Sequence, residues 1–294
     1  MSIAGGLSQA VARAVAVGAD ALQIFTRNQR QWRVPPMLPA EATAFRAAAT
    51  CAGLRFVCAH DSYLTNLASP DATVRERSVQ TLVAELKRAA MLGCTCVVLH
   101  PGSPQADGVA AGIRRLVCGI SQVLEATVEP AVMLALENTA GQGSALGADF
   151  GQLGEVLRRL DRHPRLGFCL DTCHAFAAGY DLRTAAAIDS LAREIDHTVG
   201  LDRLLLLHLN DSLRPLGSRV DRHAHVGQGA LGAAAFRCLL RSPWFDGVPG
   251  IIETPKDDET LAEDRANLER LRRFEQPGRA PHSCNGSGSA RGRR

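Results

Sequence analysis

The sequence lacks the features that would place this chain in several common classes of protein. No apolar run approaches the roughly 20 residues that a membrane helix needs, and the N-terminus has no charged segment followed by an apolar one. No C-x-x-C pair occurs among the nine cysteines, and several of them lie in or beside apolar segments, as reduced and buried cysteines do. We therefore expect a soluble, cytoplasmic protein with no membrane partner and no disulfide framework.

An excess of charge of either sign is also missing from most of the chain. The formal charge is +3, but four of the 33 basic residues and one of the 30 acidic residues lie beyond Phe274, so 29 of each sign precede that point. Affinity for nucleic acid would therefore need a local patch or bound metal ions. Residues 275–294 are rich in Gly, Ser, Pro and Arg and are expected to form a disordered tail. Residues 1–274 are expected to form a single domain.

What the chain does contain is an alternation of short apolar runs with amphipathic segments. Each run is nearly all apolar, as a strand covered on both faces must be. Strand, loop and helix in repeated order predict a parallel sheet with right-handed crossovers. We expect strands at 21–25, 55–60, 94–100, 131–138, 166–172, 204–211 and 250–254, and helices at 7–17, 40–52, 73–92, 109–126, 149–160, 184–198, 232–241 and 257–273.

The fold class that this order predicts is α/β, a (β/α)8 barrel of the TIM type that is one strand short. The closed form has eight strands, whereas seven are predicted, and the first amphipathic segment begins within seven residues of Met1. We expect either a gap in the barrel wall beside the first helix or a true start codon upstream of Met1.

Ionisable side chains end six of the seven predicted strands. Average composition would place His, Asp or Glu at such a position about one time in ten to one in six, so chance explains six of them poorly. The C-terminal ends of barrel strands converge on one mouth, where these side chains should meet. They are His60, His100, Glu137, Asp171, His208 and Glu253.

Three further groups are expected at the same mouth. His174 follows Asp171 by three residues, and Asp221 and His223 stand two apart in a polar loop, so each pair can face one way. Taken singly, such residues are more often helix caps or satisfied buried polar groups. Five histidines and four carboxylates together exceed what one tetrahedral ion can use, and they suit two or three ions.

The cysteines on either side of Asp171 raise the alternative of a thiolate site. Side chains alternate along a strand, so Cys169 should face inward one layer below Asp171, level with Cys58, Val98, Ala135 and Leu206. We expect Cys169 to fill the barrel interior without serving as a ligand.

Two loops carry weaker signals. The segment GQGALG at 227–232 matches G-x-G-x-x-G, but it follows a polar loop and not a strand, which disfavours dinucleotide binding. The segment TRNQRQWR at 26–33 follows a strand at the same mouth. It could be an ordinary solvated loop, but arginines with an aromatic residue and amides also suit the backbone and minor groove of DNA.

Seven motifs, in order along the chain, resemble those of the endonuclease IV family of apurinic/apyrimidinic endonucleases. They are HDSYLTNL (60–67), HPGS (100–103), ENTAGQGS (137–144), DTCHAFAAGYD (171–181), HLND (208–211), GSRVDRH (217–223) and IET (252–254). The resemblance implies a barrel that holds three zinc ions. His60 and His100 would hold one ion, Asp171, His208 and Glu253 a second, with Glu137 bridging the two, and His174, Asp221 and His223 the third.

The same resemblance implies the activity, the substrate and the residues that contact it. The protein would be a zinc-dependent DNA repair phosphodiesterase, a deoxyribonuclease IV, that acts on duplex DNA as a monomer. It would cleave the backbone 5′ to abasic sites, leaving a 3′-hydroxyl and a 5′-deoxyribose phosphate, and it would also trim blocked 3′ ends. Glu137 and Glu253 would be catalytic, and Arg30, Tyr63 and Leu64 would insert into the DNA.

Two other classes of function stay open at this point. A metal-dependent sugar isomerase or epimerase on the same barrel would also carry His, Asp and Glu at its strand ends, but it would need only one or two ions. A non-catalytic binder of damaged DNA would keep the loops but have a metal cluster spoiled by the missing strand. The number of ions bound and the presence of incision separate these classes.

Overall fold

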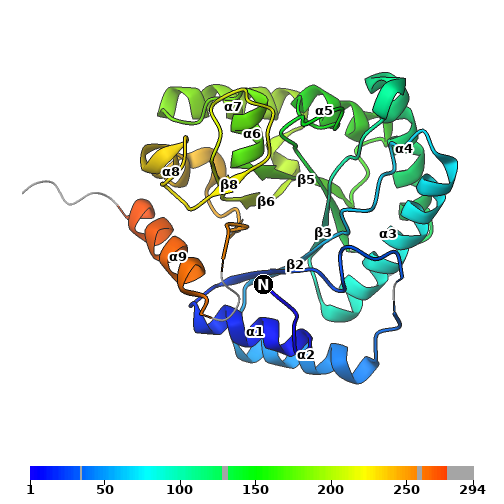
Figure 1. Ribbon diagram of the computed structural model, residues 1–294, viewed down its shortest axis with the longest axis horizontal. Coiled ribbons are helices and arrows are strands. Elements are labelled where there is room, and N and C mark those ends of the chain that lie inside the picture. The colour runs from blue at the N-terminus through cyan, green and yellow to red at the C-terminus, as the bar shows by residue number, and fades with distance from the viewer. Residues whose placement is uncertain (34, 128–131, 257–259, 277–294) are drawn as a thin grey trace, which may run out of the picture.

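The computed structural model describes residues 1–33, 35–127, 132–256 and 260–276 of the chain. A seven-stranded parallel sheet forms the centre, and its strand order β1-β2-β3-β4-β5-β6-β9 follows the chain (Figure 1). The predicted seven-stranded TIM-type barrel is thereby confirmed. The strands are β1 (Ala21–Ile24), β2 (Phe56–His60), β3 (Cys96–Leu99), β4 (Met133–Glu137), β5 (Leu166–Asp171), β6 (Leu204–His208) and β9 (Gly250–Ile251).

Each of the eight helices expected from the sequence is present, and these helices surround the sheet. Their apolar stripes explain the packing, as in α4, where Ile113, Leu116 and Ile120 are buried at helical spacing. The elements that were not predicted are the short helix α6, the antiparallel ribbon of β7 (Asp211–Ser212) with β8 (His223–Ala224), and three short 3-10 turns. The helices are α1 (Leu7–Ala16), α2 (Pro39–Cys51), α3 (Ala72–Leu92), α4 (Val109–Glu125), α5 (Phe150–Arg159), α6 (Thr172–Ala178), α7 (Ala185–Thr198), α8 (Gly232–Leu240) and α9 (Ala262–Glu275), with 3-10 turns η1 (Gln105–Asp107), η2 (Leu201–Arg203) and η3 (Pro243–Phe245).

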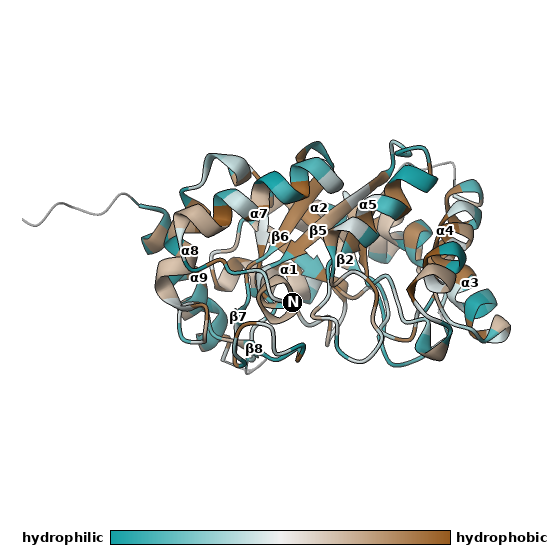
Figure 2. Ribbon diagram, turned by 90° about the horizontal axis from the view of Figure 1, so that it is seen from above, coloured by the Kyte–Doolittle hydropathy of each residue, from teal (hydrophilic) through white to brown (hydrophobic). Residues whose placement is uncertain are grey.

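The side chains inside the barrel form a layer of their own. Figure 2 shows apolar strands enclosed by helices whose outer faces are polar, with the ribbon β7–β8 among the loops. The inward layer contains the five residues predicted for it, together with two more. These are Cys58, Cys96, Val98, Ala135, Cys169, Leu206 and Ile251, all buried.

The barrel wall is open between its first and last strands. β1 and β9 are the two ends of the sheet and do not pair with each other. A cavity of about 690 Å³ lies there, lined by residues 1–4 and by both edge strands. The gap lies where the sequence led us to expect one, beside the first helix.

The ring of helices closes although the sheet does not. Arg265 of α9 donates a hydrogen bond to the Ala16 carbonyl at 3.0 Å, and Arg272 donates to the carbonyl of Gly18. These contacts join the last helix to the end of the first. Within the described ranges, no helix is long and apolar enough to cross a membrane. Most of the tail expected at 275–294, from residue 277 onward, lies outside the described residues.

Candidate metal centre

The nine ionisable side chains singled out in the sequence gather at the C-terminal mouth of the barrel. Four of them end strands as predicted, at His60, Glu137, Asp171 and His208. His100 lies one residue beyond the observed end of β3, and Glu253 lies two residues beyond that of β9. The predicted strands were slightly too long at these two ends. His174 joins them from α6, Asp221 from the loop that leads into β8, and His223 from the first position of β8.

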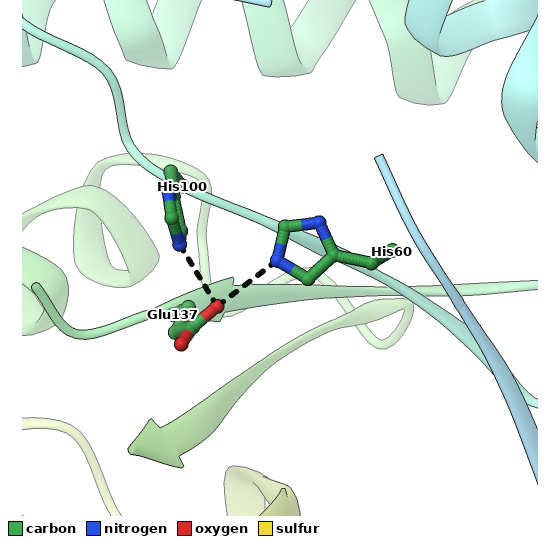
Figure 3. A group of neighbouring side chains, drawn as sticks. All are labelled: His60, His100 and Glu137. Carbon is green, nitrogen blue, oxygen red and sulfur yellow. Dashed lines mark hydrogen bonds and ion pairs between the residues drawn. The ribbon is translucent and has the colours of Figure 1, made fainter. Parts of the chain in front are cut away.

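Glu137 lies at the centre of the first group, and its side chain is fully buried. Its Oε2 atom is 3.3 Å from His60 Nε2 and 3.1 Å from His100 Nε2. Figure 3 shows both imidazoles, from two different strand ends, directed at this one oxygen. Two imidazole nitrogens and a carboxylate oxygen within 4.8 Å of one another could hold one metal ion.

The other oxygen of Glu137 belongs to a second group. Glu137 Oε1 is 3.0 Å from His208 Nδ1, and that nitrogen is also 3.3 Å from Glu253 Oε2. Asp171 completes the group, with Oδ2 at 3.8 Å from the same nitrogen. Glu137 therefore offers one oxygen to each of two adjacent groups, the geometry expected of a bridging carboxylate.

The third group lies on the outer side of the mouth. Asp221 Oδ2 is 3.2 Å from His174 Nε2, and Asp221 Oδ1 is 3.3 Å from His223 Nε2. The elements that the sequence did not predict place these residues. Asp171 caps α6 by accepting a hydrogen bond from the His174 backbone N–H at 2.7 Å, and the ribbon β7–β8 carries His223.

Three of the histidine rings are oriented by main-chain carbonyls. The Nδ1–H group of His60 donates to the Asp61 carbonyl at 2.8 Å, that of His174 to the carbonyl of Asn138 at 3.0 Å, and that of His223 to the carbonyl of Glu253 at 2.9 Å. Each bond places a hydrogen on Nδ1, so Nε2, which faces the site, is the nitrogen that the neutral ring offers to an ion, as in metal-ligating histidines.

Burial and opposite charges compete in setting the protonation of this site. Burial alone would lower the pKa of His174, but the carboxylates of Asp171 and Asp221 outweigh it and raise that pKa well above its ordinary value. Burial would also raise the pKa of Glu137, yet His208 and His100 hold it well below its ordinary range. In the metal-free protein these charges therefore favour the protonated form of His174 and the ionised form of Glu137.

The two cysteines near Asp171 border the site: Cys169 lies within 4.8 Å of donor atoms of Glu137 and His208, and Cys173 within that distance of Asp221 and His223. Burial raises the pKa of both Cys169 and Cys173 to about 12, so neither is a thiolate near neutral pH in the metal-free protein. Cys169 is fully buried within the barrel layer. The alternative of a thiolate centre is therefore disfavoured.

The donor set fits metal ions. Imidazole nitrogens and carboxylate oxygens are ordinary metal ligands, and the nine side chains that carry them gather here. In addition, His223 Nε2 is buried and has no hydrogen-bond partner among the described residues. A buried polar atom of this kind requires an explanation, and a bound cation supplies one.

Two asparagines that the sequence reasoning did not single out support the site. Asn210 donates to Asp171 Oδ2 at 2.6 Å and accepts from the Glu253 backbone N–H at 2.7 Å. Asn138 accepts from the Asp171 backbone N–H at 2.7 Å. A signal existed, since each asparagine follows a ligand candidate by one or two positions in the motifs ENT and HLND.

The glycine-rich segment 227–232 has a structural explanation. The carboxylate of Asp211, fully buried, accepts hydrogen bonds from the backbone N–H groups of Gly229 at 2.9 Å, Leu231 at 2.9 Å and Gly232 at 3.2 Å. Backbone amides that could otherwise cradle a phosphate already bind this side chain. Dinucleotide binding is thus disfavoured, as the sequence context indicated.

The loop 26–33 is anchored from below and exposed above. Arg27 is buried and pairs with Glu85 at 3.2 Å, and Arg88 donates to the Thr26 side chain at 2.9 Å. Arg30 is exposed, and it lines the same cavity as Tyr63 and Glu253.

Tyr63 lies over the first group of the site. Its side chain is 58% exposed, and its ring centre is 5.5 Å from that of His60 and 5.9 Å from that of His100. Leu64, beside it, is half-buried. The structure therefore brings Arg30 and Tyr63, two of the three residues expected to contact DNA, to the rim of the mouth.

Fold and site together define the class of protein: a parallel (β/α) barrel with histidines and carboxylates grouped at the C-terminal mouth. The family model described as xylose isomerase-like TIM barrel matches residues 11–274. Within this class, the chain belongs to the endonuclease IV family, as the motifs predicted. It is 48% identical to the probable endonuclease 4 of Chloroflexus aurantiacus over 276 residues, which cover 94% of this chain and 96% of that protein.

Solved structures agree with this assignment. The crystal structure of endonuclease IV from Thermus thermophilus has a TM-score of 0.81 and 39% sequence identity, and the match covers 93% of this chain and 96% of that one. A D-tagatose 3-epimerase-like protein is similar with a TM-score of 0.71 at 18% identity, covering 92% and 96% of the two chains. The second likeness is one of fold alone.

Proposed function

We propose that this protein hydrolyses the phosphodiester bond on the 5′ side of abasic nucleotides in duplex DNA, leaving a 3′-hydroxyl and a 5′-deoxyribose phosphate. The observation that carries the proposal is the third group. Asp221 approaches His174 and His223 at 3.2 and 3.3 Å directly beside the two groups that share Glu137. A sugar isomerase needs one or two ions and has no use for this addition.

We assign three zinc ions to the three groups. His60, His100 and Glu137 would hold the first, and Glu137, Asp171, His208 and Glu253 the second, while His174, Asp221 and His223 would hold the third. When bound, zinc would lower the pKa of water and offset the charge that builds up on a reacting phosphate. Three zinc ions would carry more positive charge than the four carboxylates carry negative charge, and the imidazoles would be neutral. The pocket would then be cationic and would attract a phosphodiester.

The exposed side chains mark the approach of the substrate. The His100 side chain is 31% exposed and that of Asp221 is 42% exposed, whereas Glu137 is fully buried below them. Glu137 and Glu253 are proposed as the catalytic residues, which orient the attacking water and accept its proton. As the water oxygen bonds to phosphorus, the bond to the 3′ oxygen breaks and that oxygen gains a proton. Blocking groups on a 3′ end are attached at the same position, which would make their removal a second activity.

The direct test is incision of a duplex that carries one abasic site. We expect the zinc-loaded protein to cut it once and to leave an end that a DNA polymerase extends, since extension requires a 3′-hydroxyl. An undamaged duplex of the same sequence is the control. Binding without incision in added zinc would instead support a non-catalytic binder of damaged DNA, and conversion of ketoses without incision would support the epimerase alternative.

We also propose that Arg30, Tyr63 and Leu64 contact the DNA around the expelled nucleotide. Tyr63→Ala should weaken binding of the abasic duplex by about tenfold, because stacking of a base on an aromatic ring contributes about 1–3 kcal/mol. The measurements are the Kd for labelled duplex and the single-turnover rate at saturating duplex. The rate should fall by a smaller factor than the factor by which the Kd rises. Val15→Ala, at an apolar position of α1 that is 54% exposed, is the matched control. An unchanged Kd in Tyr63→Ala would exclude Tyr63 as a contact.

A further inference from the structure

A buried amide lies directly beneath the proposed metal centre. Gln23 is on β1, only 7% exposed, and pairs in register with Cys58 of the inward layer. Apart from thiols, the other side chains of that layer are apolar. An amide buried in such surroundings costs free energy unless its oxygen and nitrogen both have hydrogen-bond partners. Both partners of Gln23 are residues of the site.

The two ends of the amide reach two proposed ligands of the same ion. Gln23 Nε2 donates to Glu253 Oε1 at 2.6 Å, and Gln23 Oε1 is 2.9 Å from His208 Nε2. Cys58 Sγ also donates to this oxygen at 3.4 Å. An ionised carboxylate can only accept, so the amide nitrogen must face Glu253 and the amide oxygen must face His208.

This arrangement determines which nitrogen of His208 carries the hydrogen. With the amide oxygen accepting, Nε2 carries a hydrogen, so Nδ1, which faces Glu137, Glu253 and Asp171, is the nitrogen that the neutral ring offers to an ion. His60, His174 and His223 take their orientation from main-chain carbonyls, whereas the partner of His208 is a side chain. A substitution can remove this partner without altering the backbone.

We propose that Gln23 is a positioning residue for the second metal ion. It fixes the tautomer of His208 and holds Glu253 so that Oε2, not Oε1, faces the His208 nitrogen. The inference rests on the proposed function, since it assumes that Asp171, His208 and Glu253 bind an ion. It adds that a residue on an edge strand, outside the nine donors, controls how tightly that one ion is held.

Two variants separate the two hydrogen bonds. Gln23→Met has nearly the same length and makes neither bond, while Gln23→Glu keeps an acceptor for His208 and loses the donor to Glu253. Hydrogen-bond partners of metal ligands typically contribute about 10- to 100-fold in metal affinity. We therefore expect Gln23→Met to weaken the binding of one ion by that factor and to leave the others unchanged, with Gln23→Glu weakened less than Gln23→Met.

The readout is the number of zinc ions retained per chain across a series of chelator-buffered free zinc concentrations. Gln122→Met, at an exposed position of α4, is the matched control and should behave like the wild type. Chemical unfolding of the metal-free variants identifies any loss of folding, and if Gln23→Met does not fold, Gln23→Glu alone must show weaker retention of one ion.

Retention curves of Gln23→Met that match the wild type would overturn the role of Gln23, as would equal weakening of every ion. Equal weakening in Gln23→Met and Gln23→Glu would overturn the part assigned to the His208 bond. A wild-type protein that binds zinc but shows no effect at Gln23 refutes only this inference. A wild-type protein that binds no zinc refutes the proposed function itself.

Discussion

Replacing Glu137 by Gln is expected to lower the rate of abasic-site incision by roughly 10⁴- to 10⁶-fold, the losses seen when one member of a catalytic group is removed. The reason is geometric and electrostatic. The two carboxylate oxygens of Glu137 face two different groups, with Oε2 at 3.1 Å from His100 and Oε1 at 3.0 Å from His208. A glutamine would present an NH₂ group to one of them and would remove a full negative charge from a fully buried position.

The single-turnover rate at saturating duplex is the quantity to measure, because it isolates chemistry from DNA binding. Glu155→Gln, a change of the same chemistry on the surface of α5 where Glu155 pairs with Arg158 and Arg159, should leave the rate unchanged. Glu253→Gln should also lower the single-turnover rate, since Glu253 Oε2 lies 3.3 Å from the same His208 nitrogen as Glu137 Oε1. A loss below tenfold in either variant would remove that residue from the catalytic machinery.

Removal of metal by thorough chelation should abolish incision, and added zinc should restore it. The same experiment has a pH dependence whose sign follows from the site. The pKa values of His174 and His208 are raised well above their ordinary value in the metal-free protein. Burial would lower both, but Asp171 and Asp221 outweigh it at His174, and Cys169 with the carboxylates of Glu253 and Glu137 outweighs it at His208. Both imidazoles are then protonated near neutral pH, whereas zinc binds the neutral ring. Zinc must displace these protons, so its apparent affinity should rise with pH.

Folding stability of the metal-free protein should fall toward both ends of the pH range, because the raised histidine pKa values and the lowered Glu137 pKa act in opposite directions. A raised histidine pKa gives stabilisation that is fully present below the ordinary pKa of about 6.5 and is lost as the pH rises through the folded-state value. The lowered pKa of Glu137 acts oppositely, so its contribution is present above its ordinary pKa and is lost as the pH falls through the folded-state value.

Calorimetric titration with zinc in buffers of different ionisation enthalpy counts the protons that zinc binding releases. Zinc binding without proton release near pH 7, or full incision after chelation, would contradict the proposed site.

Much of this site could be read from the positions where strands end. The sequence places histidines and carboxylates at the ends of apolar runs, and parallel strands of a barrel bring those ends together. The prediction was least accurate at the strand boundaries, where β9 ends at Ile251 and not at residue 254. The short helix α6 was not predicted, because its seven residues are too few for a clear helical period.

The supporting residues were harder to find than the proposed ligands. Asn138 and Asn210 adjoin ligand candidates in the sequence, but their hydrogen bonds to Asp171 cross 33 and 39 positions of the chain. Gln23 sits in the middle of an apolar run and carries no pattern of its own. Its bond to His208 spans 185 positions, and only the curvature of the sheet brings the first and sixth strands close enough for it.

The amino-acid sequence by itself determined the alternation of strands and helices, the seven strands, the family and the nine proposed ligands, since these depend on local periodicity and on residue type. The tertiary structure alone decided that Glu137 gives one oxygen to each of two groups, which nitrogen of each imidazole faces the site, and that an amide from β1 lies beneath His208. The physical reason is that hydrogen bonds and metal sites depend on distances of a few tenths of an ångström between residues on different strands. Those distances are set by register, twist and packing, which no short stretch of sequence contains.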